Sequence, residues 1–215
     1  MLLNGVHLLP DLSGALVYPK ERLVAVSDPI GDPAARQAPQ LAAEALKRLG
    51  AVLRQRRPAT IVWLGTSLPQ LVADGRLAKR DGDELARLTQ AHAWHWLGDG
   101  LPTGLPGHAA AELKAGSLSF RNTALPGATV LGEVSAQGWP VATIDGRTWP
   151  CFVFDGRRMV MPAFGGRSDG LNVLGPGFQH LFRRPFQALM LAGGRILTRP
   201  RARLEAPPPP PAPIL

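Results

Sequence analysis

The sequence predicts an α/β (α+β) fold in which two mixed β-sheets pack face to face with helices outside. Three observations support this prediction: a strand, helix, strand succession in the first third, a second helix and strand after it, and a change after residue 117 to short strands joined by turns. The 215 residues, 45% of them hydrophobic, are enough for one substantial core. We therefore expect a single domain over residues 1–205 and a proline-rich, extended tail over residues 206–215.

The chain begins with β structure and continues into a helix. Residues 2–9 and 15–18 flank a turn rich in Pro, Asp, Ser and Gly, which predicts a hairpin before the apolar strand at residues 23–27. Apolar residues at helical spacing, with charged residues between them, predict an amphipathic helix over residues 38–56. The continuous apolar run at residues 60–65 is typical of a strand covered on both faces and would complete a right-handed βαβ unit.

A second helix and strand, and then a series of short strands, follow. Residues 81–91 have the acidic start and leucine spacing of a helix, and residues 93–97 have the pattern of a short strand. Further strands are expected at residues 118–120, 129–131, 141–144, 151–154 and 159–161. The dipeptide Asp155-Gly156 predicts a hairpin between the last two, and Gly193-Gly194 predicts a closing hairpin of residues 188–191 and 196–197.

The net charge and the single cysteine limit the classes of function that the protein could have. Lys and Arg exceed Asp and Glu by 24 − 16 = 8, and the excess is mostly arginine. An Arg-rich surface favours polyanions such as DNA, although arginine that merely occupies solvated faces would give the same composition. The single cysteine, Cys151, excludes an intrachain disulfide and a cysteine-cluster zinc site, and its apolar neighbours predict burial. Without a signal-like N-terminus or a run of about 18 apolar residues, we expect a cytoplasmic protein and no membrane partner.

Functional residues in an α/β sheet are expected beyond the carboxyl ends of its strands. The residues at those positions are Asp28, Gly65-Thr66, Gly98-Asp99-Gly100 and the turn after Val134. Taken alone, Asp28 has a simple structural interpretation as an aspartate that caps a turn or a helix.

The C-terminal part of the chain carries a resemblance to a known family. Residues 151–165, continuing into residues 170–174, resemble the calcineurin-like metallophosphoesterases, and specifically the bacterial DNA-ligase-associated metallophosphoesterases, a family of DNA-repair endonucleases. Residues 13–16 and 21–23 support the match, which extends over the whole chain. The resemblance implies a metallophosphoesterase-like four-layer sandwich, and a site in which two metal ions activate water against a phosphodiester.

The first three metal-binding motifs of that superfamily are altered here. The first, Asp-x-His, keeps Asp28 but has Ile30 in place of the histidine. The metal-bridging aspartate of the second motif corresponds to Thr66. In the third motif, Gly-Asn-His-Asp, the asparagine corresponds to Asp99 and the histidine that stabilises the leaving group corresponds to Gly100.

The last two motifs are altered as well. Asn122 takes the place of an isolated histidine, and Gln137 and Trp139 take the places of two further histidines. Tryptophan and isoleucine offer a metal no usable lone pair, and amide side chains offer only weak neutral carbonyls. The resemblance therefore predicts a vestigial site without a cofactor. The alternative is a single Mg²⁺ or Mn²⁺ ion, held weakly by Asp28 and Asp99.

Other chemistry-bearing residues leave alternatives open. His92 and His95 are spaced to hold a metal only on a helix, whereas their surroundings have a strand pattern. Glu133 could form an acid/base pair with Asp28 or Asp99, but a carboxylate in a turn is usually solvated. Trp139 could fill the vacated cavity or stack on a nucleic-acid base.

Three functional hypotheses follow from the sequence. The first is a catalytically inactive homologue that serves as a binding or assembly module in DNA repair, with a ligase, helicase or nuclease as partner. The second is a weak metal-dependent phosphodiesterase or endonuclease with a reduced, one-metal site. The third, which is compatible with the first, is DNA binding through the arginine-rich surface.

Overall fold

The computed structural model of the chain describes residues 1–127 and 130–206. Its helices are α1 (Ala38–Arg56), α2 (Ser67–Ala73), α3 (Lys79–Ala91), α4 (Pro176–Gln179) and the 3-10 helix η1 (Arg201–Arg203). Its strands are β1 (Leu2–Leu3), β2 (Val6–His7), β3 (Leu9–Pro10), β4 (Leu16–Tyr18), β5 (Leu23–Ser27), β6 (Thr60–Leu64), β7 (Ala93–Leu97), β8 (His108–Ala110), β9 (Glu112–Ala115), β10 (Leu118–Arg121), β11 (Glu133–Ser135), β12 (Val141–Ile144), β13 (Arg147–Phe154), β14 (Arg158–Val160), β15 (Gln187–Ala192) and β16 (Arg195–Pro200). No helix among the described residues is long and apolar enough to cross a membrane. The predicted tail lies, from residue 207 onward, outside the described residues.

The first sheet has the strand order β3-β4-β5-β6-β7-β8. Strands β5 to β8 are parallel, and β3 and β4 join them as an antiparallel hairpin. The register pairs Ser27 with Leu64 and Leu64 with Leu97, so the carboxyl ends of β5, β6 and β7 lie side by side. This arrangement brings together the strand-end residues that the sequence singles out.

The second sheet has the order β16-β15-β13-β14-β11-β10-β9, and β12 also pairs with β13. It is mixed, because β10, β11 and β14 are parallel while the other pairs are antiparallel. The turn predicted at Asp155 connects β13 to β14, and the Asp155 carboxylate accepts the backbone N–H groups of Arg157 and Arg158, each at 3.0 Å.

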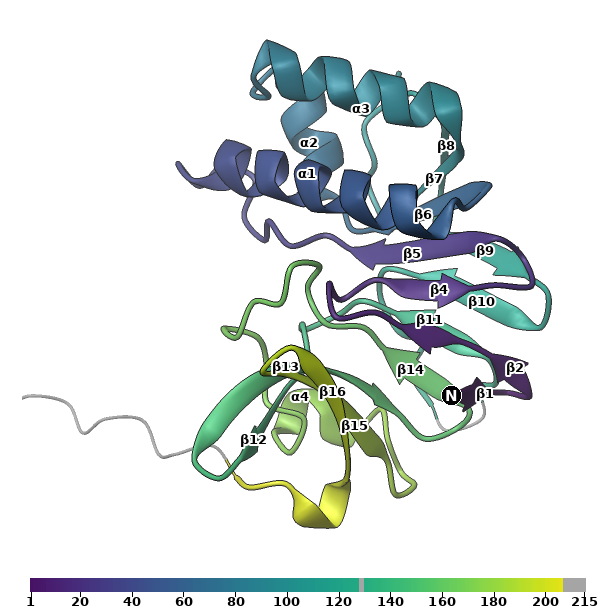
Figure 1. Cartoon of the computed structure of the whole chain (residues 1–215), viewed down its shortest axis with the longest axis vertical. Helices are drawn as coiled ribbons and strands as arrows, with labels where there is room; N and C mark the ends of the chain where they lie inside the picture. Colours follow the sequence, from purple (N-terminus) through teal and green to yellow (C-terminus); the bar gives the residue numbers. More distant parts are fainter. Residues whose placement is uncertain (128–129, 207–215) are drawn as a thin grey trace, which may run out of the picture.

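Three clusters of buried apolar residues separate four layers of structure, which confirms the predicted α+β sandwich. The first cluster lies between the first sheet and helices α1, α2 and α3, which stand together on its outer face (Figure 1). The second lies between the two sheets and includes Val62 and Leu97 from one and Phe120 and Phe152 from the other. The third covers the outer face of the second sheet, where α4 and β12 pack.

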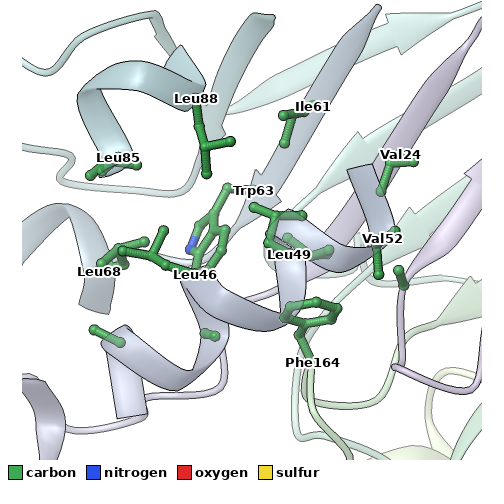
Figure 2. Packing of buried hydrophobic residues seen from close by; sticks show 14 of the residues in the cluster. Val24, Leu46, Leu49, Val52, Ile61, Trp63, Leu68, Leu85, Leu88 and Phe164 are labelled. Carbon is green, nitrogen blue, oxygen red and sulfur yellow. The ribbon is translucent and has the colours of Figure 1, made fainter. Parts of the chain in front are cut away.

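Three tryptophans form the centre of the first cluster. The rings of Trp63, Trp94 and Trp96 lie 5.0–6.3 Å apart, measured between centroids. Figure 2 shows Trp63 among Leu46 of α1 and Leu68 of α2. Because these rings are fully buried, they are core residues and are not available to a ligand.

The structure also contains elements that the sequence does not predict. Helix α2 is short and carries Pro69 in its first turn, and β8 and β9 contain few of the β-branched or aromatic residues that favour strands. The strand expected at residues 129–131 begins outside the described residues. Val130 and Leu131 are not in a strand, and β11 instead covers Glu133–Ser135.

Candidate functional site

The strand-end site consists of the seven positions that the resemblance assigns to a metal centre. They are Asp28, Thr66, Asp99, Gly100, Asn122, Gln137 and Trp139. The first four follow the adjacent strands β5, β6 and β7, and the others follow β10 and β11 of the second sheet. The loop after β14 closes toward this site, since the N–H of Phe164 donates to the carbonyl of Ser27 at 3.1 Å.

Asp28 is buried and holds three neighbouring segments together. Its Oδ1 accepts the backbone N–H of Ile30 at 2.9 Å. Its Oδ2 accepts the indole N–H of Trp63 at 3.0 Å and the backbone N–H of Leu68, in the first turn of α2, at 2.8 Å. Both carboxylate oxygens are therefore engaged by the protein, as expected for a capping aspartate.

The close packing around Asp28 extends to Gly65. A Cβ on Gly65, whose φ is +136°, would lie 2.3 Å from the Cβ of Asp28, so a larger residue would displace the aspartate. Burial raises the pKa of Asp28, while the N–H donors of Leu68, Ile30 and Trp63 act in the opposite direction. The Asp28 carboxylate is thus buried and hydrogen-bonded by groups of the protein itself.

Ile30 and Trp139 place apolar side chains beside this aspartate. Ile30 is 3% exposed and packs in the first core cluster. The indole N–H of Trp139 donates to the backbone carbonyl of Asp28 at 3.0 Å. A Cβ on Gly31 would lie 2.9 Å from the Trp139 ring, so the ring lies against the backbone just after Asp28. These contacts agree with the interpretation that Trp139 fills space.

Arg167, which the sequence does not single out, covers the outer side of Trp139. Its guanidinium carbon lies 5.0 Å from the centroid of the Trp139 ring. Its Nη1 donates to the carbonyl of Pro29 at 2.9 Å, and its Nε and Nη2 form a two-point ion pair with Asp169. Arg167 therefore ties the loop after β14 to the loop after β5.

The other positions of the strand-end site serve the backbone or face solvent. Gln137 Oε1 accepts the N–H of Ala124 at 2.7 Å, which links the loops after β10 and β11. The backbone carbonyl of Asn122 accepts the N–H of Ala136 at 3.1 Å in the same region. Asp99 and Gly100 lie exposed in the turn after β7.

Thr66 immediately precedes α2, and its side chain faces the chain after β7. A Cβ on Gly98 would lie 2.5 Å from Thr66 Cγ2. Within residues 1–127 and 130–206, no group of three or more His, Cys, Asp or Glu side chains is placed to hold a metal ion. The donors present at the strand-end site therefore do not fit a two-metal centre.

Glu133 is not the solvated turn carboxylate that the sequence suggests. It lies in β11, is fully buried, and pairs in register with Arg158 of β14. Arg158 Nε lies 3.0 Å from Glu133 Oε1, and the N–H of Leu125 donates to Oε2 at 2.9 Å. Burial raises the pKa of Glu133, against the effect of the Leu125 N–H and the Arg158 charge. Glu133 is a structural ion-pair residue of the second sheet.

The structure pairs two histidines from neighbouring strands. His95 in β7 and His108 in β8 are register partners, and their ring centroids lie 5.3 Å apart. His95 lies within a strand, as its surroundings predict, and His92 lies at the end of α3. Partial burial and the nearby His108 lower the pKa of His95 and so favour its neutral form.

This pair predicts a pH-dependent stability. The folded-state pKa of His95 is lowered, so neutral His95 contributes to the free energy of unfolding above the ordinary histidine pKa. This contribution is lost as the pH falls through the lowered pKa. Unfolding free energies measured between about pH 7.5 and about pH 5 should therefore decrease with falling pH, and His95→Gln should reduce this decrease. The exposed His180→Gln should leave it unchanged. Equal pH profiles for His95→Gln and the unmodified protein would contradict this prediction.

The two sheets and their outer layers define a mixed α+β sandwich. A solved structure with this fold is nuclease MPE of Pseudomonas putida, which superposes with a TM-score of 0.71. The superposition covers 93% of this chain and 98% of that chain at 21% sequence identity, so it shows a shared fold. No protein-family model and no curated protein matches the sequence.

Proposed function

We propose that this protein is a degenerate relative of the DNA-ligase-associated metallophosphoesterases that no longer hydrolyses phosphodiesters. It would act in the cytoplasm as a binding or assembly module in DNA repair. The proposed partners are DNA and repair proteins such as a ligase, a helicase or an active nuclease. The resemblance of the C-terminal segment and the likeness to a nuclease fold support the family.

The proposed loss of catalysis rests mainly on the hydrogen bonds that the Asp28 carboxylate already accepts. A two-metal mechanism needs carboxylate and imidazole ligands with free lone pairs. Here the only metal-ligand residue kept from the family accepts three N–H groups of its own protein. Trp139 donates to the backbone carbonyl of Asp28, and Ile30 is buried in the first core cluster two residues further on. The sequence changes have therefore replaced metal coordination with internal hydrogen bonding and packing.

The one-metal alternative depends on Asp28 and Asp99 acting together. Magnesium accepts few carboxylates and keeps several waters, so two aspartates could in principle hold it. However, Asp28 would have to release buried N–H donors before it could coordinate an ion, and each unpaired donor is unfavourable by about 1–3 kcal/mol. The contacts of Asp28 thus favour the inactive module.

A phosphodiesterase assay tests this proposal. Purified protein is incubated with bis-p-nitrophenyl phosphate and Mn²⁺ or Mg²⁺, and p-nitrophenol release is compared with a metal-only blank. We expect no release above the blank, because the strand-end site offers no set of ligands for hydroxide-generating metals. Metal-dependent hydrolysis that disappears in both Asp28→Asn and Asp99→Asn would establish the one-metal alternative instead.

A further inference from the structure

Strand β16 presents arginines along the edge of the second sheet. It is the last strand of the sheet and, among the described residues, is paired only with β15. Leu197 packs on the third core cluster, and alternate residues of a strand share a face, so Arg195 and Arg199 lie on the same face as Leu197. Arg195 is exposed and Arg199 is half-exposed. This edge therefore carries positive charge on the side of α4 and β12.

More arginines lie near one end of this edge, on two segments that are separated in sequence. The N–H of Arg201 donates to the carbonyl of Phe186 at 3.0 Å, and its guanidinium carbon lies 5.5 Å from the centre of the Phe186 ring. Arg203 follows in the same 3-10 helix, and Arg183 and Arg184 shortly precede Phe186. All four of these arginines are exposed. We call these four residues together with Arg195 and Arg199 the β16 arginine surface.

A hollow with a tryptophan in its wall adjoins this surface at its other end. Its volume is about 600 Å³, and its lining includes Trp149, Ile144 and Leu197. Arg147 and Arg195, both exposed, lie at the hollow as well. Trp149 is half-buried and packs on the third core cluster, so part of its ring remains open to the hollow. The hollow thus combines an aromatic wall with two guanidinium groups.

The charge of the β16 arginine surface is not neutralised by ion pairs. None of its arginines takes part in an ion pair between described residues. Two acidic residues, Asp145 and Glu205, lie in this region. The Glu205 carboxylate accepts the N–H groups of Asp145 and Gly146 at 2.8 and 3.0 Å, where it caps the turn after β12. The six positive charges of this surface therefore outnumber the two nearby carboxylates.

We propose that the β16 arginine surface and the Trp149 hollow bind single-stranded nucleic acid. Arginines spaced along a strand edge can contact successive phosphates, and an aromatic ring in a hollow can stack on an unpaired base. A duplex would offer the phosphates but would keep its bases out of the hollow. The β16 arginine surface comes from β16, η1 and the segment before β15, and the Trp149 hollow is lined by residues of β12, β13 and β16. The strand-end site lies elsewhere, at the ends of β5, β6, β7, β10 and β11 (Figure 1). The proposal deepens the proposed function, on whose binding role it rests, by naming the partner.

The first test measures the charge contribution. Fluorescence anisotropy follows binding of a labelled oligothymidylate of about 12 nucleotides, which is within the length range of single-strand sites. The double variant Arg195→Gln/Arg199→Gln should weaken binding about tenfold and reduce the slope of log affinity against log salt by about 1.4, since each phosphate contact contributes about 0.7. Arg54→Gln/Arg80→Gln removes the same charge from exposed positions on α1 and α3, leaving a net charge of 8 − 2 = +6 in both variants, and should have little effect.

The second test measures base stacking. Trp149→Leu keeps an apolar side chain against the third cluster but removes the ring. It should weaken oligothymidylate binding by about fivefold or more, because stacking accounts for a large part of single-strand affinity. Binding of heparin, which has charge but no bases, should stay the same. Circular dichroism and guanidinium unfolding confirm that each variant is folded.

Three results would overturn this proposal. They are an equal loss of affinity in the two double-arginine variants, an equal effect of Trp149→Leu on heparin and oligothymidylate, and binding of a duplex of the same length as tightly as the single strand. The phosphodiesterase assay separates this failure from that of the proposed function. Metal-dependent hydrolysis with normal binding at β16 would reject only the inactive site, whereas an inert protein that binds no single strand would reject only the β16 proposal.

Discussion

Replacement of Asp28 by alanine should lower the free energy of unfolding by about 4 kcal/mol, because three buried N–H donors lose an acceptor at about 1–3 kcal/mol each. The donors are the backbone N–H groups of Ile30 and Leu68 and the indole N–H of Trp63. Relief from burying a carboxylate offsets part of this loss. Guanidinium chloride unfolding, followed by tryptophan fluorescence, measures the change.

Asp99→Ala is the matched control for that experiment. Asp99 is the other aspartate that the resemblance assigns to a metal, but it is exposed, so its replacement should change stability by less than about 0.5 kcal/mol. If Asp28 were instead kept to bind an ion, Asp28→Ala would not lower the free energy of unfolding, because it would eliminate an unfavourable buried charge. An Asp28→Ala variant as stable as the original protein would therefore contradict the structural role of Asp28.

Replacement of Glu133 by methionine should destabilise the protein by about 3–5 kcal/mol, because it leaves the buried guanidinium of Arg158 without its counter-charge. The two residues are register partners in β11 and β14, and both side chains are almost inaccessible to solvent. Leu125 also loses the acceptor of its backbone N–H. Equilibrium unfolding in denaturant checks the size of the loss.

Two further variants decide whether this loss comes from the ion pair. The double variant Glu133→Met/Arg158→Met buries no unpaired charge. Its loss of unfolding free energy should therefore be smaller than the sum of the losses in the two single variants. Glu112→Gln breaks the more exposed pair with Arg121 and should cost about 1 kcal/mol or less. Additive losses in the double variant would show that Glu133 and Arg158 do not act as a pair.

The sequence predicts the parts of the fold that have a clear hydrophobic period. Helix α1 and strands β5, β6 and β7 lie within a residue of the predicted bounds, because amphipathic spacing and continuous apolar runs define them locally. Strands β8 and β9 are missed, since His108 and Glu112 belong to segments with little strand preference that pair only because their neighbours are in place.

The strand-end site could be predicted only in part. The sequence directs attention to Asp28 and Trp139, because both lie where the resemblance expects metal ligands. It does not reveal their contacts. Arg167 is 138 residues from Pro29, and the two are joined only when the loop after β14 closes over the end of β5. Such long-range contacts leave no periodic signal in the sequence.

Glu133 shows a different limit of sequence reasoning. A glutamate next to a glycine indicates a solvated turn, and no adjacent residue supplies a counter-charge. Its partner, Arg158, is 25 residues further along the chain and reaches it through the parallel pairing of β11 and β14. One sequence feature does point to strands here, since Glu133 and Arg158 each directly precede the apolar residues of a short strand. Only the register shows that the two charges lie opposite each other.

We propose that the strand-end site has exchanged metal coordination for internal hydrogen bonds and packing. The most direct test is elemental analysis of protein purified without chelators and then equilibrated with Mn²⁺. The ligand set predicts metal content near zero after removal of free ion, because Asp28 is already engaged and its neighbours are apolar. One or two tightly held ions per chain, lost in Asp28→Asn, would contradict it.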